Sequence, residues 1–419
     1  MNHDNQLGEK LAIAEPAHHA LASSRATVRH FAFTGGGFAI IAVTFGLARY
    51  SYGLFMPEIG LEFGLTEESL GLIASASYLG YISTTVFSLW LSGIIGPRRL
   101  IVAGAVSAAI GMALVAVASS VAALAVGIVL AGASPGFVFA PISDAVMQAV
   151  PTDQQNRSWT VINSGNGAGV LIAGVVSLWL TGEWRWSWAA FAFLAGIAVF
   201  WCAAVMPSGP IAGSSAPTKL SVRWFFKPEA WPLYGLSLLA GGVTTVYWTF
   251  ATSIIESVGE NLQLGGGFRS FETLRIMFWS LLGAAGIAGA VSGDLISHFG
   301  LKRTLRGTCL AMAASIGVLA AAPGYLSTIA TSAIIFGITF ILVTGAIGVW
   351  SVHIFQNRPS AGFGATFLVF ALGALISPAV AGVFAVRFGL AFVFVGTMIL
   401  SGFMALLTPR MDVKSMRGG

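Results

Sequence analysis

The sequence predicts an all-α integral membrane protein with about twelve transmembrane helices. Of its 419 residues, 56% are hydrophobic and only 9% are charged, whereas soluble domains carry roughly 25% charged residues. The apolar residues fall into blocks of about 20 residues or more, which is the length that a helix needs to cross roughly 30 Å of hydrocarbon. Too few charged residues remain to cover soluble domains of this size, so the blocks are expected to lie in a bilayer.

The blocks begin after a polar stretch at residues 1–30, which we expect to be a disordered cytoplasmic tail. This stretch lacks the apolar core that a secretory signal requires. The expected spans are residues 32–57, 68–93, 99–119, 121–149, 157–181, 186–206, 231–257, 270–297, 303–322, 326–355, 361–386 and 389–409.

A stretch rich in Pro, Gly and Ser divides the spans into two equal sets, and this composition is typical of a linker. The sequence therefore predicts five parts. They are the tail at 1–30, an N-terminal six-helix bundle at 31–206, a cytoplasmic linker at 207–228, a C-terminal six-helix bundle at 229–410 and a cytoplasmic tail at 411–419.

The basic residues indicate the orientation, because short cytoplasmic loops collect Lys and Arg. With the N-terminus inside, sixteen of the 21 basic residues fall on the cytoplasmic side, four fall on the opposite side and Arg49 falls within the first span. We therefore expect a multi-pass protein of the cytoplasmic (inner) membrane with both termini in the cytoplasm. The basic residues are spread over short loops, so the net charge of +5 does not indicate a nucleic-acid partner.

A similar loop follows the second span of each half. Residues 89–99 read LWLSGIIGPRR and residues 293–303 read GDLISHFGLKR. Both loops resemble the motif G-x-L-x-D-R-x-G-R-[KR]-[KR] of the major facilitator superfamily. The matching residues are Leu91, Gly96, Arg98 and Arg99 in the first copy and Gly293, Leu295, Gly300, Lys302 and Arg303 in the second, while Gly93 and Ser297 replace the Asp of the motif.

The resemblance implies two pseudo-symmetric six-helix bundles (the MFS fold), a central cavity between them and alternating access. In that family the loop helps to hold the two halves together on the cytoplasmic side. Two segments that would indicate a drug/proton antiporter are incomplete. Ile128 stands where one motif has an Arg, and the glycines at 165, 167 and 169 lack the Pro of the other motif. These glycines are expected to serve helix packing. The candidate residues for coupling or gating are Asp144, Arg98, Arg99, Asp294, Lys302, Arg303 and His353, the alternative being that the loops only anchor the topology.

Arg49 is the most informative residue, because a guanidinium within the hydrocarbon is expensive and normally faces a water-filled cavity or a partner. Phe45 and Tyr52 fall on its helical face at i − 4 and i + 3. An Arg flanked by aromatic rings suits a carboxylate or another planar anion. The alternative is an ion pair between Arg49 and Glu58 or Glu256 near the outer mouth.

Other spans supply polar and aromatic residues that could line the same cavity or bond a neighbouring helix. The seventh span, the counterpart of the first, contributes Tyr247 and Trp248 at similar depth. The candidate substrate-binding residues are Arg49, Phe45, Tyr50, Tyr52, Tyr78, Tyr81, Asn163, Asn166, Tyr247 and Trp248.

These observations favour a secondary transporter that moves a small organic solute, with an organic anion such as a carboxylate as the favoured class and proton coupling left open. The sequence contains no constellation typical of an enzyme. No cofactor or metal is indicated, since Cys202 and Cys309 lack further ligands at suitable spacing. The expected partners are the substrate, the lipid bilayer and, if transport is coupled, protons, with the chain acting as a monomer. The alternatives are an exporter of hydrophobic or drug-like compounds and a non-transporting solute sensor on the same fold.

Overall fold

The computed structural model describes residues 28–152, 154–180, 183–209, 225, 227–257, 271–289, 292–356 and 359–409. The elements in these ranges are all helices. Ten helices are long and apolar enough to cross a membrane, and two shorter apolar helices lie at Thr273–Ala288 and Leu390–Met404. Together they match the twelve predicted spans and confirm the all-α membrane fold. Most of the predicted linker, residues 210–224 and 226, lies outside the described residues.

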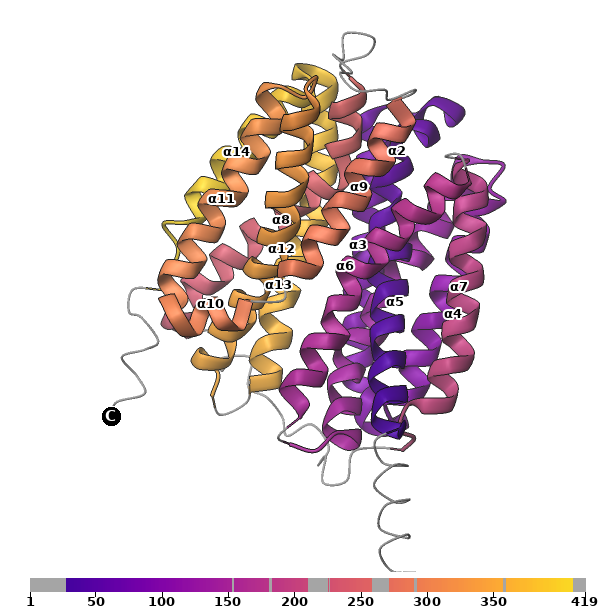
Figure 1. The fold of residues 1–419 in the computed structure, drawn as a ribbon, viewed down its shortest axis with the longest axis vertical. Helices are drawn as coiled ribbons and strands as arrows, with labels where there is room; N and C mark the ends of the chain where they lie inside the picture. Colours follow the sequence, from indigo (N-terminus) through magenta and orange to yellow (C-terminus); the bar gives the residue numbers. More distant parts are fainter. Residues whose placement is uncertain are drawn as a thin grey trace, which may run out of the picture.

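The helices of the first half lie together on one side of the molecule (Figure 1). The first span runs from Val28 to Phe63, and its middle is a π-helix rather than an α-helix. The elements are η1 (Ala42–Tyr50), α2 (Ser51–Phe63), α3 (Glu67–Ile95), α4 (Pro97–Ala116), α5 (Val121–Ala149), α6 (Gln155–Trp179) and α7 (Trp184–Val205).

The helices of the second half form the other side, coloured from pink through orange to yellow in Figure 1. In the region of the predicted eighth span at 270–297 the structure describes α9 and α10, and residues 290–291 between them lie outside the described residues. The elements are η3 (Pro228–Ala230), α8 (Trp231–Glu256), α9 (Phe271–Ala288), α10 (Ser292–Phe299), α11 (Leu301–Ala321), α12 (Leu326–Ile354), α13 (Pro359–Phe388) and α14 (Leu390–Met404).

The two halves meet through backbone contacts at the end of the molecule where α2 and α8 finish, which we call the closed end. Pro57 lies inside α2 and has no N–H, so the carbonyl of Gly53 loses its helical donor. Thr252 Oγ1 of α8 donates a hydrogen bond to that carbonyl. A Cβ on Gly53 would lie 1.9 Å from the carbonyl oxygen of Trp248. Only glycine allows α2 and α8 to cross this closely.

A second pair of helices joins the halves toward the same end. In α3, Ser75 Oγ accepts a hydrogen bond of 3.1 Å from the backbone N–H of Ala379 in α13. A Cβ on Gly71 would lie 2.3 Å from the carbonyl oxygen of Pro378. The contact between α3 and α13 is therefore also a contact of backbones.

The two motif loops lie at the opposite end, which we call the open end. Gly96 joins α3 to α4 with φ 81° and ψ 162°. Gly300 joins α10 to α11 with φ 83° and ψ 156°. A positive φ favours glycine, because it has no Cβ. The two copies of the motif thus turn the chain in the same way, as expected of an internal repeat.

The glycines of α6 serve helix packing, as predicted. A Cβ on Gly165 would lie 2.3 Å from the carbonyl oxygen of Phe38, and one on Gly169 would lie 2.2 Å from that of Ala42. Gly167 faces Gly283 of α9. The small residues let α6 approach both the first span and the second half of the molecule.

Candidate functional site

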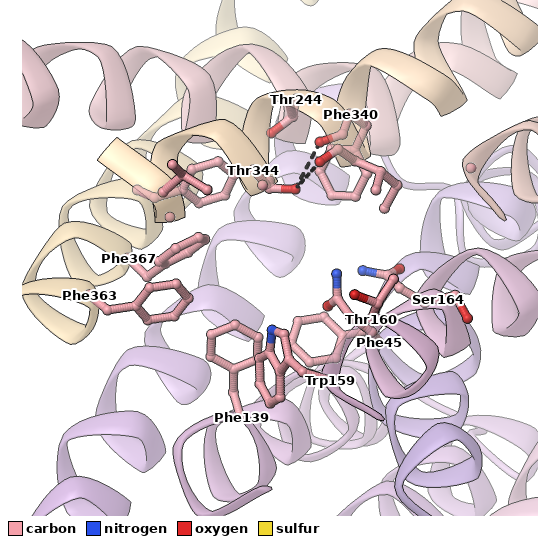
Figure 2. A pocket seen from close by; sticks show the side chains of 18 of the residues that line it. Phe45, Phe139, Trp159, Thr160, Ser164, Thr244, Phe340, Thr344, Phe363 and Phe367 are labelled. Carbon is pink, nitrogen blue, oxygen red and sulfur yellow. Dashed lines mark hydrogen bonds between the residues drawn. The ribbon is translucent and has the colours of Figure 1, made fainter. Parts of the chain in front are cut away.

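A cavity of about 1230 Å³ lies between the two halves. Its walls come from η1, α3, α5 and α6 of the first half and from α8, α9, α10, α11, α12 and α13 of the second. It extends from Arg49 to Gly300 and His353 near the open end. Figure 2 shows labelled residues of both halves around this space, including Phe139 and Trp159 from the first half and Thr244 and Thr344 from the second.

Arg49 lies in the wall of this cavity, within the π-helix η1. Its guanidinium carbon is 4.1 Å from the ring centroid of Tyr78 and 4.1 Å from that of Tyr81, and it is 5.9 Å from that of Phe45. Rings at such distances stabilise a cation by roughly 0.5–2 kcal/mol each. Among the described residues, the ion pairs all involve Arg185 or Arg275 and none involves Arg49. The guanidinium is therefore supported by rings, and no carboxylate in the described part of the chain neutralises it.

The second half completes the surroundings of Arg49. Thr245 Oγ1 of α8 donates a hydrogen bond of 3.2 Å to the hydroxyl of Tyr78. The ring of Trp248 stacks on Tyr50 at 4.4 Å between centroids. Both contacts join the halves directly beside the guanidinium. A solute bound at Arg49 would touch both halves.

The structure brings eight of the ten predicted binding residues to the cavity. They come from η1, α3, α6 and α8, and all eight belong to its lining: Phe45, Arg49, Tyr50, Tyr78, Tyr81, Asn163, Asn166 and Trp248.

Tyr52 and Tyr247 are placed elsewhere, which corrects the expectation for these two residues. The hydroxyl of Tyr52 donates to the carbonyl of Leu70 at 3.1 Å. Tyr52 lies in α2, beyond the end of η1, and it is not among the residues that line the cavity. Tyr247 is fully buried and shares a hydrogen bond of 2.7 Å with Ser332. Neighbouring residues on a helix point about 100° apart, so Tyr247 faces the bundle interior while Trp248 faces the cavity.

The alternative pairing of Arg49 with Glu58 or Glu256 is wrong in this structure, because both carboxylates face another arginine. Arg275 of α9 forms an ion pair with Glu58 of α2, and its Nη1 lies 3.6 Å from Oε2 of Glu256 in α8. Arg275 is one of the four basic residues that the count of Lys and Arg places on the outer side, and in the structure its side chain is buried. The position of Arg275 inside an apolar stretch of the sequence could have indicated that its side chain is buried.

Asp144 and Arg98 do not pair with each other. Asp144 accepts a hydrogen bond of 2.5 Å from Ser92 Oγ of α3. The Nε of Arg98 donates to the backbone carbonyl of Met206, just after α7. Arg98 therefore ties the motif loop to its own half rather than to an acid.

The remaining candidates for coupling or gating are divided between the open end and the cavity. Arg99 and Arg303 are exposed and Lys302 is half-buried at the start of α4 and α11. His353 lines the cavity, and its Nδ1 lies 2.8 Å from the carbonyl oxygen of Val349. The side chain of Asp294 lies outside the described residues.

Several aromatic residues of the cavity lining were not predicted from the sequence. Phe139 of α5, Trp159 of α6 and three phenylalanines of α13 belong to its lining. Phe363, Phe367 and Phe370 follow the i, i + 4, i + 7 pattern of one helical face, which could have indicated a shared surface.

The fold and the cavity define a helical membrane transport protein, in which two halves enclose a space large enough for a small organic solute. The chain belongs to the Major Facilitator Superfamily, whose family model matches residues 38–378.

Individual proteins are similar to this chain in part of their sequence or in fold. The uncharacterized transporter YgaY of Escherichia coli O157:H7 is 28% identical over 176 residues, which is 40% of this chain and 40% of that protein. A mutant of the nucleoside transporter NupG is similar with a TM-score of 0.74 and 14% identity, covering 89% of this chain and 98% of that one. A bacterial homologue of the human lysosomal transporter Spinster, in an inward-facing and unoccupied conformation, has a TM-score of 0.70 and 14% identity, covering 91% and 96%.

Proposed function

We propose that this protein is a secondary transporter that carries a small organic anion across the cytoplasmic membrane by alternating access. The observation that carries the proposal is Arg49, a cation held by Tyr78 and Tyr81 in the cavity wall with no carboxylate partner among the described residues. A guanidinium binds a carboxylate through two parallel hydrogen bonds, and such charge-assisted bonds are strong where water is excluded. The guanidinium of Arg49 is thus well suited to bind a planar anion in the cavity.

The proposed orientation places the open end in the cytoplasm, because the basic residues of both motif loops lie there. The structure then corresponds to an inward-facing state, with the closed end toward the outside. In the proposed cycle the N-terminal bundle at 31–206 and the C-terminal bundle at 229–410 rock against each other around the site beside Arg49.

Binding of organic anions to the purified full-length protein tests this function. Calorimetric titration with a panel of monocarboxylates, dicarboxylates and matched amines should identify carboxylates as ligands. Arg49→Ala should weaken the binding of a carboxylate by about one to two decades, because a lost charge-assisted partner costs roughly 1.5–3 kcal/mol. Arg49→Lys should restore only part of the affinity, since an ammonium keeps the charge but loses the planar fork.

The matched control is Arg387→Ala, which removes an exposed arginine near the C-terminal end of α13. This variant should bind as the parent does. Selective binding of amines, or carboxylate binding that Arg49→Ala leaves intact, contradicts the anion assignment. An exporter of hydrophobic compounds would then be the better description of the cavity.

A further inference from the structure

The cavity wall next to Arg49 is made of aromatic rings with Phe139 at their centre. The ring centroid of Phe139 lies 5.8 Å from that of Phe45, 6.0 Å from Trp159, 5.8 Å from Phe363 and 5.7 Å from Phe367. We call these five residues the Phe139 cluster. Figure 2 shows Phe139 and Trp159 on one wall of the cavity and Phe363 and Phe367 on the adjoining wall. The cluster therefore combines rings of both halves.

The rings of this cluster are not fully covered by protein. Phe139, Trp159, Phe363 and Phe367 are each half-buried, and all of them line the cavity. An apolar ring that faces water is unfavourable by roughly 25 cal/mol for each Å² left exposed. A flat apolar group in the cavity would cover these faces and gain the offset or edge-to-face geometry that aromatic pairs prefer.

The cluster lies next to the cationic site. Phe45 belongs to both, because its ring centroid is 5.9 Å from the guanidinium carbon of Arg49 and 5.8 Å from the centroid of Phe139. A single small molecule can therefore reach both places if a few bonds separate its carboxylate from its apolar part. The cavity also contains hydroxyl and amide groups, for example Thr244 of α8 and Asn163, which lies about one turn beyond Trp159 on α6.

We infer that the substrate is an aryl carboxylate, with its carboxylate on Arg49 and its aromatic ring in the Phe139 cluster. This inference rests on the proposed function and narrows it from organic anions to those that carry a ring. The cluster is then the part of the site that selects the substrate, since any carboxylate could pair with Arg49.

Three probe molecules separate the contributions of charge and ring. They are 3-phenylpropionate, propionate, which lacks the ring, and 3-phenylpropanol, which lacks the charge. Titrated calorimetrically into the purified full-length protein, 3-phenylpropionate should bind about tenfold or more tightly than either of the others, because ring burial adds apolar area and stacking. Arg49→Ala should remove its advantage over 3-phenylpropanol.

Phe139→Leu tests the cluster directly, because it keeps an apolar side chain but removes the ring. The affinity for 3-phenylpropionate should fall about five- to tenfold, while that for propionate stays unchanged. Phe367→Leu should act in the same direction and serves as a second test if Phe139→Leu does not fold. Phe384→Leu is the matched control, since this ring lies exposed on α13 and does not line the cavity.

The outcomes distinguish the two proposals. If propionate and 3-phenylpropionate bind equally well and both depend on Arg49, the anion function stands and the aryl inference is wrong. If Phe139→Leu and Phe367→Leu lower the thermal stability but leave the preference for 3-phenylpropionate over propionate unchanged, the rings only pack the two halves together. The inference is then again wrong. If neither acid binds the folded protein, or 3-phenylpropionate binds as tightly to Arg49→Ala as to the parent, the proposed function fails together with the inference.

Discussion

Arg275 holds three helices together at the closed end. It extends from α9 to Glu58 of α2 in the other half and to Glu256 of α8 in its own half. Its side chain is 6% exposed, whereas the carboxylates are 24% and 38% exposed, so water screens the acids but hardly reaches the arginine. The arrangement places two negative charges around a single positive one.

Arg275→Gln should therefore destabilise the closed end. The change leaves Glu58 and Glu256 facing each other without a cation, and breaking a buried pair costs about 3–5 kcal/mol, less here because the acids are partly exposed. We expect a lower melting temperature for the detergent-purified protein. The double variant Glu58→Gln with Arg275→Gln should recover part of the loss, because the repulsion between acids is gone. An unchanged melting temperature in Arg275→Gln would show that this pair contributes nothing.

A residue of the site could be predicted from the sequence where its side chain is charged but lies within an apolar span. Arg49 stood out because an arginine in an apolar span needs a reason. The Phe139 cluster was not found, because a phenylalanine in a transmembrane helix is equally expected against lipid, against another helix or in a cavity. The α-helical spacing places Tyr52 on the face of Arg49, but its hydroxyl bonds to the carbonyl of Leu70 and it does not line the cavity.

Among the elements, the crossing of α2 and α8 depends on one glycine. In Gly53→Ala the new Cβ would lie 1.9 Å from the carbonyl oxygen of Trp248, so the two helices must move apart. We expect a lower melting temperature and weaker closure of this end. Gly196→Ala in α7 is the matched control, because nothing lies within 4 Å of a Cβ there.

The control variant should be neutral or stabilising, since Ala is favoured over Gly in a helix by up to about 1 kcal/mol. A thermal unfolding scan of both variants in the same detergent measures the difference. If Gly53→Ala melts at or above the temperature of Gly196→Ala, the helices do not depend on backbone contact at this crossing.

The positions of the helices were predicted within a few residues, because length and hydropathy strongly constrain a transmembrane span. The predicted fifth block and α6 differ by two residues at each end, and the predicted fourth block coincides with α5. The π-helix η1 was not predicted. It is a change in backbone hydrogen bonding that leaves apolar composition, the signal used for the spans, unaltered.

At the scale of the whole molecule, the distribution of Lys and Arg predicts which end faces the cytoplasm. Ser119, between α4 and α5, and Gln154, just before α6, are exposed at opposite ends of the molecule. In intact cells a membrane-impermeant thiol reagent should label Ser119→Cys and should not label Gln154→Cys. The native Cys202 and Cys309 are both buried, so the background should be low. The reverse labelling pattern would invert the proposed orientation.

The hydrogen bond from Thr252 to Gly53 makes the closed end easy to hydrate. Pro57 supplies no N–H to this carbonyl, so separating the halves exposes an acceptor that a water molecule can satisfy at once. Exchanging such a bond for one to water changes the free energy by only about 1 kcal/mol. In the proposed cycle this one hydrogen bond would therefore oppose the opening of the closed end only weakly, and the Arg275–Glu58 ion pair would be the stronger constraint between the halves there.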